Sequence, residues 1–531
     1  MSTDAKSIFI LGCGTMQLPA LNIARELGWT IAAADGDDSA VGRSLCDRFF
    51  HVDLKDIPGL INAAREFRDA GSLDGVLTAG TDFSLSVALV ARSLGLPGHS
   101  PDAARLATDK SLMRRRFREA GVPSPAYAEI PAGQDAAAAV QAVPGPWVVK
   151  PVDSMGARGV VLIQDAAGLQ EALAEAQAYS RTGRAIVESF IPGPEFSLDA
   201  LVENGRLIRC GLADRHIVYP PRFIEIGHTI PSSVDKDTED SLWRVFEQGI
   251  KALGLTHGAA KGDIKLSPQG PVIGEIAARL SGGYMSGWTW PYASGVKPTL
   301  GALNLAVGLP AGPLEPVENL VCAEKALVSI DGRILAVRGR DRAARLPGVK
   351  DLFIRYSPGD TVRFPRNNVE KIGNIIAVGP TRRDAEDRAL NALRTLKVHL
   401  DPAEDSTGHF LMNRAAFPPD AFPIPCRGPS SRHKDLCSWL ERLWDRHPPK
   451  LLEGCPEELP LISPPPLPDG SPADSLGRSI PEVLHLLEEE QLIRRTPSPV
   501  VETPMLSAFW KALIRGGLAG ARWYLTRKPA S

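Results

Sequence analysis

Short apolar runs alternate with longer amphipathic stretches over the first hundred residues of the chain. The apolar runs cover residues 7–11, 30–34 and 75–78, and the amphipathic stretches cover residues 18–27 and 84–94. Strands that alternate with helices in this way form parallel sheets, because each helix carries the chain back across the sheet. The pattern therefore predicts a Rossmann-like parallel β/α layer over residues 1–108.

The turn after the first apolar run contains two glycines, in Gly12-Cys13-Gly14. A dinucleotide-binding fingerprint needs a third glycine three positions further on, where this chain has Gln17. We therefore interpret the segment as a tight strand-to-helix turn. A small-anion site at the N-terminus of the following helix is the alternative.

A basic helix predicted over residues 109–120 precedes a series of short strands. The strands are expected at residues 146–151, 160–163, 185–189, 195–202, 207–212, 262–267 and 271–276. Residues 316–400 predict a β-rich unit that a helix over residues 382–395 closes. This succession predicts an α/β (α+β) chain in which a second, mixed domain follows the N-terminal layer.

The last part of the chain has a different character. Prolines are dense from Pro448 to Pro504, which is typical of an extended linker. Within it, Ser479 and Glu482 have the spacing of a capping box and predict a helix to about residue 494. Residues 505–525 are amphipathic, and we expect this helix to dock on its own protein or a partner. A position on a membrane surface is the alternative.

Composition excludes several classes of protein. The 531 residues carry a net charge of −2, so there is no basic excess to hold a nucleic-acid backbone. The N-terminus has no signal-peptide pattern, and no apolar window is long enough to span a membrane. The seven cysteines are scattered, which favours a reducing, cytoplasmic location.

Charged residues with phosphate and metal chemistry gather between residues 109 and 283. Lys150 ends a strand just before a turn of small residues, whose backbone N–H groups could surround phosphate oxygens. Asp263 and Glu275 lie on neighbouring predicted strands, and antiparallel pairing would bring both carboxylates to one Mg²⁺. Arg279 follows, where it could neutralise a transferring phosphoryl group. Taken singly, each residue also fits an ordinary turn or solvated face.

In their order and spacing, these residues resemble the ATP-grasp superfamily. Lys110 and Lys150 look like its two nucleotide-phosphate lysines, and Ser154 and Gly156 fall in a segment that resembles its phosphate-covering loop. The resemblance implies an N-terminal layer, a two-lobed nucleotide-binding core and a closing β-rich unit. It implies ATP as the nucleotide.

The segment from Glu188 to Glu195 resembles the adenine hinge of that superfamily. The resemblance implies that Glu188 and the backbone of Phe190 and Ile191 hold adenine, and that Glu195 holds the ribose hydroxyls. Asp263 and Glu275 fall on the magnesium-ligand positions. The asparagine common between the second metal ligand and the arginine is Ala277 here, so one or two Mg²⁺ ions are expected.

The segment Phe223–Pro231 is similar to one found in L-amino acid ligases. That similarity implies that Glu225 anchors the amino group of a substrate and that His228 assists at the tetrahedral centre. A capped turn before Pro231 is the alternative interpretation of His228, with equal weight. Arg279 would bind substrate and stabilise an acyl phosphate, which makes Arg279 and His228 the expected catalytic residues.

The resemblance implies an ATP-dependent, ADP-forming carboxylate–amine ligase that uses an amino acid. A bicarbonate- or formate-activating enzyme and a nucleotide-binding scaffold protein are the alternatives. The expected domains cover residues 1–108, 109–315, 316–402 and 403–531. Small-molecule carboxylate and amine substrates are the expected partners, without nucleic acid, and a homodimer is left open.

Overall fold

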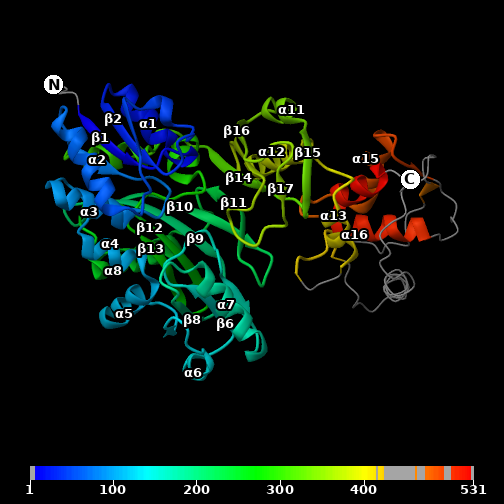
Figure 1. Cartoon of the computed structure of the whole chain (residues 1–531), viewed down its shortest axis with the longest axis horizontal. Helices are drawn as coiled ribbons and strands as arrows, with labels where there is room; N and C mark the ends of the chain where they lie inside the picture. Colours follow the sequence, from blue (N-terminus) through cyan, green and yellow to red (C-terminus); the bar gives the residue numbers. More distant parts are fainter. Residues whose placement is uncertain (1–5, 414–416, 424–460, 463–472, 496–503, 528–531) are drawn as a thin grey trace. The chain divides into compact units, whose positions relative to one another are not determined.

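The computed structural model describes residues 6–413, 417–423, 461–462, 473–495 and 504–527. The N-terminal sheet has four parallel strands in the order β3-β2-β1-β4. They are β1 (Ser7–Leu11), β2 (Thr30–Asp35), β3 (Arg48–His51) and β4 (Gly75–Leu77). The helices between and after them are α1 (Leu18–Glu26), α2 (Ile57–Asp69), α3 (Ser84–Leu94) and α4 (Pro101–Thr108). Figure 1 labels β1 and β2 of this sheet beside helix α1. The predicted parallel layer is confirmed, while β3, α2 and α4 were not predicted.

The turn between β1 and α1 is closed by protein groups. The amide of Gly12 donates to Ala34 O at 2.8 Å, and that of Cys13 donates to Asp35 Oδ2 at 2.7 Å. The amide of Gly14 donates to Gln17 Oε1 at 3.1 Å. Because three successive N–H groups already have acceptors within the protein, the tight-turn interpretation holds and these three amides are not available to an anion.

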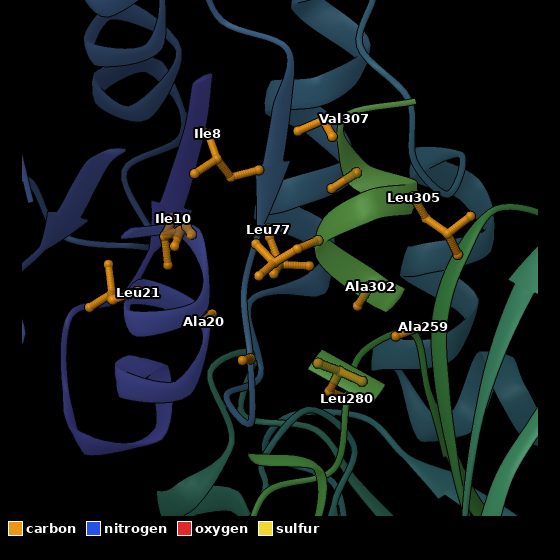
Figure 2. Packing of buried hydrophobic residues seen from close by; sticks show 14 of the residues in the cluster. Ile8, Ile10, Ala20, Leu21, Leu77, Ala259, Leu280, Ala302, Leu305 and Val307 are labelled. Carbon is orange, nitrogen blue, oxygen red and sulfur yellow. The ribbon is translucent and has the colours of Figure 1, made fainter. Parts of the chain in front are cut away.

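The N-terminal sheet shares a hydrophobic core with later parts of the chain. Figure 2 shows Ile8, Ile10 and Leu77 of the N-terminal sheet next to the helix that carries Ala302 and Leu305. All five side chains belong to one buried cluster. That helix is α10 (Pro298–Ala306), which follows the short helix α9 (Trp290–Ser294). Burial of this joint surface stabilises the layer against α10 and its neighbours, since apolar burial is the main favourable contribution to folding.

Two antiparallel sheets form the centre of the chain. The smaller has the order β5-β8-β6-β7, and the larger begins β13-β12-β9-β10-β11. The smaller consists of β5 (Tyr127–Ile130), β6 (Trp147–Pro151), β7 (Val161–Ile163) and β8 (Ala185–Ser189), with helices α6 (Ala137–Ala142) and α7 (Leu169–Tyr179). The larger includes β9 (Glu195–Glu203), β10 (Arg206–Val218), β11 (Ile224–Ile230), β12 (Gly258–Ser267) and β13 (Gly270–Ala277).

Helix α8 (Lys236–Leu253) packs on β12 and β13 of the larger sheet, and helix α5 (Lys110–Ala120) packs on α8. Phe117 of α5 and Phe246 of α8 are fully buried in one cluster with Ile264 and Ile273 of the sheet. The shared core therefore fixes α5, and with it Lys110, relative to strand β13.

The chain divides into two compact units, Met1–Glu324 with Ile376–Glu386, and Lys325–Ile375 with Asp387–Ser531. Strands β14 (Val321–Leu327) and β18 (Gly373–Gly379) and helix α12 (Arg382–Thr395) continue from one unit into the other. Every site residue predicted from the sequence lies in the first unit.

The second unit contains a small sheet in the order β17-β15-β19 and the C-terminal helices. Its further elements are β15 (Gly332–Arg338), α11 (Arg340–Ala344), β16 (Val349–Ile354), β17 (Thr361–Val362), β19 (Lys397–Leu400), α13 (Asp405–Met412), β20 (Leu461–Ile462), α15 (Ile480–Glu489), β21 (Arg494–Arg495) and α16 (Pro504–Thr526).

Helix α16 docks on its own unit. It contacts α13, α15 and β19, and Trp523 donates from Nε1 to Asp401 O at 2.8 Å. The expected docking on self is confirmed for the amphipathic stretch, and most of the predicted proline-rich linker lies outside the described residues. No helix in the described parts of the chain has both the length and the apolar character needed to cross a bilayer.

Candidate active site

Lys110 is the first residue of α5 and is almost completely buried. Asp109 caps the helix by accepting from the amides of Ser111 and Leu112. The Lys110 amide donates to Val152 O at 2.8 Å, and its Nζ donates to Ser154 O at 3.0 Å. A capped helix start therefore places this ammonium beside the predicted phosphate loop.

Lys150 of strand β6 is the second buried lysine of this site and lies near Lys110. Its Nζ is 2.7 Å from Glu188 Oε2, and Arg114 Nε is 2.8 Å from Glu188 Oε1. Burial lowers the pKa of Lys150, an effect that Glu188 opposes. Burial alone would raise the pKa of Glu188, but the two cations Arg114 and Lys150 hold it below its usual range. Arg114 was not predicted, because it occupies an ordinary position in a basic helix.

The small-residue loop after β6 is built from left-handed backbone. Gly156, Ala157 and Gly159 have φ values of 69°, 59° and 67°. Glycine takes this conformation without steric cost, whereas Ala157 is strained there. Left-handed residues also occur in the backbone turns that surround anions, so the loop is compatible with the role expected for Ser154 and Gly156.

The hinge after β8 is held on both sides. The amide of Phe190 donates to Pro146 O at 2.8 Å, and its ring stacks on Phe223 with centroids 6.1 Å apart. Lys265 Nζ lies 4.9 Å from the centroid of Phe190. A Cβ on Gly193 would come within 2.0 Å of Leu266 O, so only glycine permits this approach of the hinge to β12. Ile191 lies between these fixed points.

Asp263 and Glu275 stand directly opposite each other in the antiparallel register of β12 and β13. This confirms the pairing expected from the sequence. Glu275 Oε1 lies 3.4 Å from Lys110 Nζ, and Lys261 pairs with Asp263. Although burial opposes ionisation, Lys110, Lys261 and Arg279 lower the pKa of Glu275 to about 2.

The two carboxylates fit Mg²⁺ as a donor set. Both are oxygen ligands on adjacent strands, and Glu275 is ionised at any physiological pH. Among the described residues no group of three or more acidic, histidine or cysteine side chains could hold a metal ion. Two protein carboxylates are nevertheless sufficient where nucleotide phosphates supply the remaining ligands, which is how Mg²⁺ commonly binds.

Arg215 of β10 lies at the centre of three carboxylates. Its guanidinium pairs with Glu195, lies 2.6 Å from Glu225 Oε2 and lies 3.0 Å from Asp263 Oδ1. Burial and the neighbouring carboxylates raise the pKa of Glu195, although Arg215 opposes this. The structure thus brings together residues that the sequence assigned to ribose, substrate and metal. Arg215 itself carried no sequence signal.

Arg279 follows β13 and is buried, with Nη1 donating to Leu280 O at 3.1 Å. The next residues are held by Asp199, which accepts from the Ser281 amide at 3.1 Å and from Trp290 Nε1 at 2.9 Å. Burial raises the pKa of Asp199 despite these hydrogen bonds. Leu280 forms a bridge with Ala79 of the N-terminal layer, so the segment after Arg279 is fixed at both ends.

His228 is completely buried in the middle of strand β11, so its interpretation as a turn residue is wrong. Its Nε2 shares a hydrogen bond of 2.9 Å with Thr289 Oγ1. Its Nδ1 lies 3.4 Å from Glu324 Oε2. The imidazole is therefore hydrogen-bonded through Nε2, while Nδ1 is buried near a carboxylate without a hydrogen bond to it. Glu225 lies on the same strand beside Arg215.

A pair of buried lysines, a left-handed loop, a clamped hinge and paired carboxylates thus surround one region of the first unit. Together with the two antiparallel sheets, they define a ligase of the ATP-grasp fold. Family models match the chain twice, with the ATP-grasp domain at residues 143–287 and the L-amino acid ligase C-terminal domain 2 at residues 326–401. The chain therefore contains an ATP-grasp domain followed by an L-amino acid ligase C-terminal domain, which is the domain set of an ATP-grasp carboxylate–amine ligase.

Individual relatives agree with this assignment. Carnosine synthase 1 from Gallus gallus is 28% identical over 439 residues, which cover 77% of this chain and 46% of that protein. The enzyme from Homo sapiens is 27% identical over 443 residues, which cover 77% and 52%. This chain therefore spans about half the length of these relatives. The L-amino acid ligase from Bacillus licheniformis shares the fold, with a TM-score of 0.65, 20% identity, and coverage of 75% of this chain and 99% of that one.

Proposed function

We propose that the protein joins an amino acid to an amine through an acyl phosphate, with release of ADP and phosphate. The observation that carries the proposal is the approach of Lys110 to Glu275, 3.4 Å apart, with Asp263 opposite in register. This cluster can neutralise phosphate charge at one point, which is the main task in phosphoryl transfer. The L-amino acid ligase domain at residues 326–401 favours an amino acid as the carboxylate.

ATP would bind between the two antiparallel sheets. Lys110 and Lys150 would hold the phosphates, and the loop with Ser154 and Gly156 would cover them. The hinge backbone at Phe190 and Ile191 would take adenine. Glu188, whose two oxygens pair with Arg114 and Lys150, would also face adenine, and Glu195 would bind the ribose hydroxyls.

Asp263 and Glu275 would hold Mg²⁺, which supplies charge neutralisation at the phosphates when bound. Ala277 lacks a ligand atom, so a second ion would depend on water and phosphate oxygens. The number of ions is therefore either one or two. The ionised state of Glu275, fixed by Lys110, keeps the site ready for a cation at neutral pH.

In the first chemical step, a carboxylate oxygen of the substrate attacks the γ-phosphorus, and the bond to the ADP oxygen breaks. In the second step, the amine attacks the acyl carbon and phosphate leaves, while the amine gives up one proton. Arg279 would bind the substrate carboxylate and neutralise the acyl phosphate. Glu225 would bind the ammonium group of the amino acid substrate. His228 would assist at the tetrahedral centre, for which its contact with Thr289 must be exchanged.

The test is consumption of Mg-ATP in the presence of pooled amino acids and small carboxylates, with products weighed by mass spectrometry. We expect ADP, phosphate and an adduct lighter than its two components by one water. AMP and pyrophosphate would reject the acyl-phosphate route. Turnover that requires bicarbonate would favour a carboxylating enzyme, and nucleotide binding without turnover would favour a scaffold role.

The remaining organisation follows from the sequence. We propose that residues 1–108, 109–315, 316–402 and 403–531 form the successive domains, and that the protein works in the reducing cytoplasm. The cysteines in the described residues, Cys13, Cys46, Cys210 and Cys322, are free thiols, which agrees with that location. Small-molecule substrates are the proposed partners, and a homodimer is one assembly to test by light scattering.

A further inference from the structure

Arg215 has a position that the proposed catalytic roles do not use. Its side chain is 9% exposed and lies on β10. Its three carboxylate partners come from three other strands, Glu195 from β9, Glu225 from β11 and Asp263 from β12. One guanidinium therefore links four strands of the larger sheet.

The three carboxylates around Arg215 need its positive charge for compensation. Glu195, Glu225 and Asp263 have side chains that are 19%, 12% and 13% exposed, so solvent screens them weakly. Lys261 also pairs with Asp263, and Lys265 lies near Glu195. Removal of one partner from a buried ionic cluster leaves an uncompensated charge, which is strongly unfavourable. Arg215 is thus the cation that allows these carboxylates to approach one another.

We propose that Arg215 is a positioning residue that holds the metal carboxylate Asp263 until nucleotide phosphates bring Mg²⁺. The proposal rests on the proposed function, because it uses the assignment of Asp263 to the metal. In the absence of nucleotide, a divalent cation would have to take Asp263 from Arg215 against charge repulsion. When nucleotide is present, phosphate oxygens offer the guanidinium new acceptors and complete the ligands of the ion.

The same arrangement connects the metal site to the substrate site. Arg215 contacts Glu225 at 2.6 Å, so the guanidinium occupies the carboxylate proposed for the substrate ammonium. Movement of Arg215 towards phosphate would free Asp263 for the metal and Glu225 for the amino acid together. Metal and amino acid would then both bind best after the nucleotide.

The test uses the full chain without nucleotide and Mn²⁺ as the probe, with free Mn²⁺ measured by electron paramagnetic resonance. In Arg215→Met, which keeps much of the side-chain volume, we expect Mn²⁺ to bind about tenfold more tightly than in the wild type. The double variant Arg215→Met/Asp263→Asn should lose this gain. Arg209→Met is the matched control, because Arg209 lies on the same strand and pairs with the exposed Asp240.

Thermal unfolding provides a second readout. Arg215→Met should have a lower Tm than the wild type, and Mg²⁺ alone should raise the Tm of the variant but not that of the wild type. If Arg215→Met does not fold, Arg215→Lys carries the measurement, with an intermediate gain in Mn²⁺ affinity. Equal Mn²⁺ affinity in wild type and variant would overturn the proposal. Failure of the proposed function would instead appear as absent ligase turnover in the wild type, while the Mn²⁺ result stands.

Discussion

Arg114 and Glu188 are 74 positions apart in the sequence and form an ion pair of 2.8 Å whose side chains are 0% and 4% exposed. Lys150 binds the other oxygen of Glu188 at 2.7 Å. The carboxylate therefore joins helix α5, strand β6 and the end of strand β8 at one buried point. Its main structural effect is to keep two cations, one of them the proposed phosphate ligand Lys150, close together without repulsion.

The variant Glu188→Gln tests this effect. Loss of the charge leaves Arg114 and Lys150 buried without their shared anion, so we expect about 3–5 kcal/mol less stability. Urea unfolding of the full chain, followed at the transition of the first unit, measures the difference in free energy of unfolding between variant and wild type. Glu119→Gln is the control, because Glu119 pairs with Arg116 on the exposed side of the same helix. A loss of less than about 1 kcal/mol would contradict the buried-cluster argument.

Arg279→Ala tests the assignment of Arg279 to the reacting phosphoryl group. ADP formation should fall by about a thousandfold or more, because the cation proposed to hold the substrate carboxylate and neutralise the reacting phosphoryl group is removed. Nucleotide affinity, measured by calorimetry, should change little, since adenine, ribose and the lysine contacts remain. Arg279→Lys, which retains the charge, should recover part of the rate. Wild-type turnover in Arg279→Ala would reject the assignment.

His99 is expected to make stability depend on pH. Its Nε2 is 3.0 Å from Ala259 O, and its Nδ1 accepts from the His257 amide, so only the neutral ring satisfies both contacts. Burial lowers its pKa to about 4. Because the unfolded chain takes up this proton near pH 6.5, its contribution is complete above pH 6.5 and is lost as the pH falls towards 4.

The variant His99→Gln isolates that contribution. Glutamine keeps a donor for Ala259 O but does not titrate. Between pH 7 and pH 4, the free energy of unfolding of the variant should therefore fall by about 2 kcal/mol less than that of the wild type. Denaturant unfolding at several pH values measures this difference. At pH 8 both proteins have a neutral side chain, which provides the reference. Parallel pH profiles would exclude His99 as the cause.

Trp523→Ala tests the docking of the C-terminal helix. Trp523 is 1% exposed and donates to Asp401 O, so its truncation should destabilise the second unit by about 3–5 kcal/mol. Trp523→Phe removes the donor but keeps most of the packing and should cost about 1–2 kcal/mol. Calorimetry of the full chain separates the transitions of the two units. Unchanged unfolding in Trp523→Ala would show that α16 adds no stability.

Secondary structure was predicted best where one periodicity is strong. The helices Ser84–Leu94 and Arg382–Thr395 have the bounds expected from their apolar spacing. Strand Arg48–His51 was missed, since its state depends on pairing with β2 rather than on its own pattern. Helix Ile57–Asp69 was missed because Pro58 and Gly59 at its start resemble a turn, although Asp56 caps it.

The sequence by itself determined the fold class, many of the strands and the pairing of Asp263 with Glu275, because periodicity and motif spacing are local properties of the chain. Only the tertiary structure decided the partners of Glu188, the burial of His228 and the central place of Arg215. Those depend on which charges from distant strands and helices come within a few ångströms of each other. In the sequence, such residues look like any solvated charge, and only burial makes each one need a particular partner.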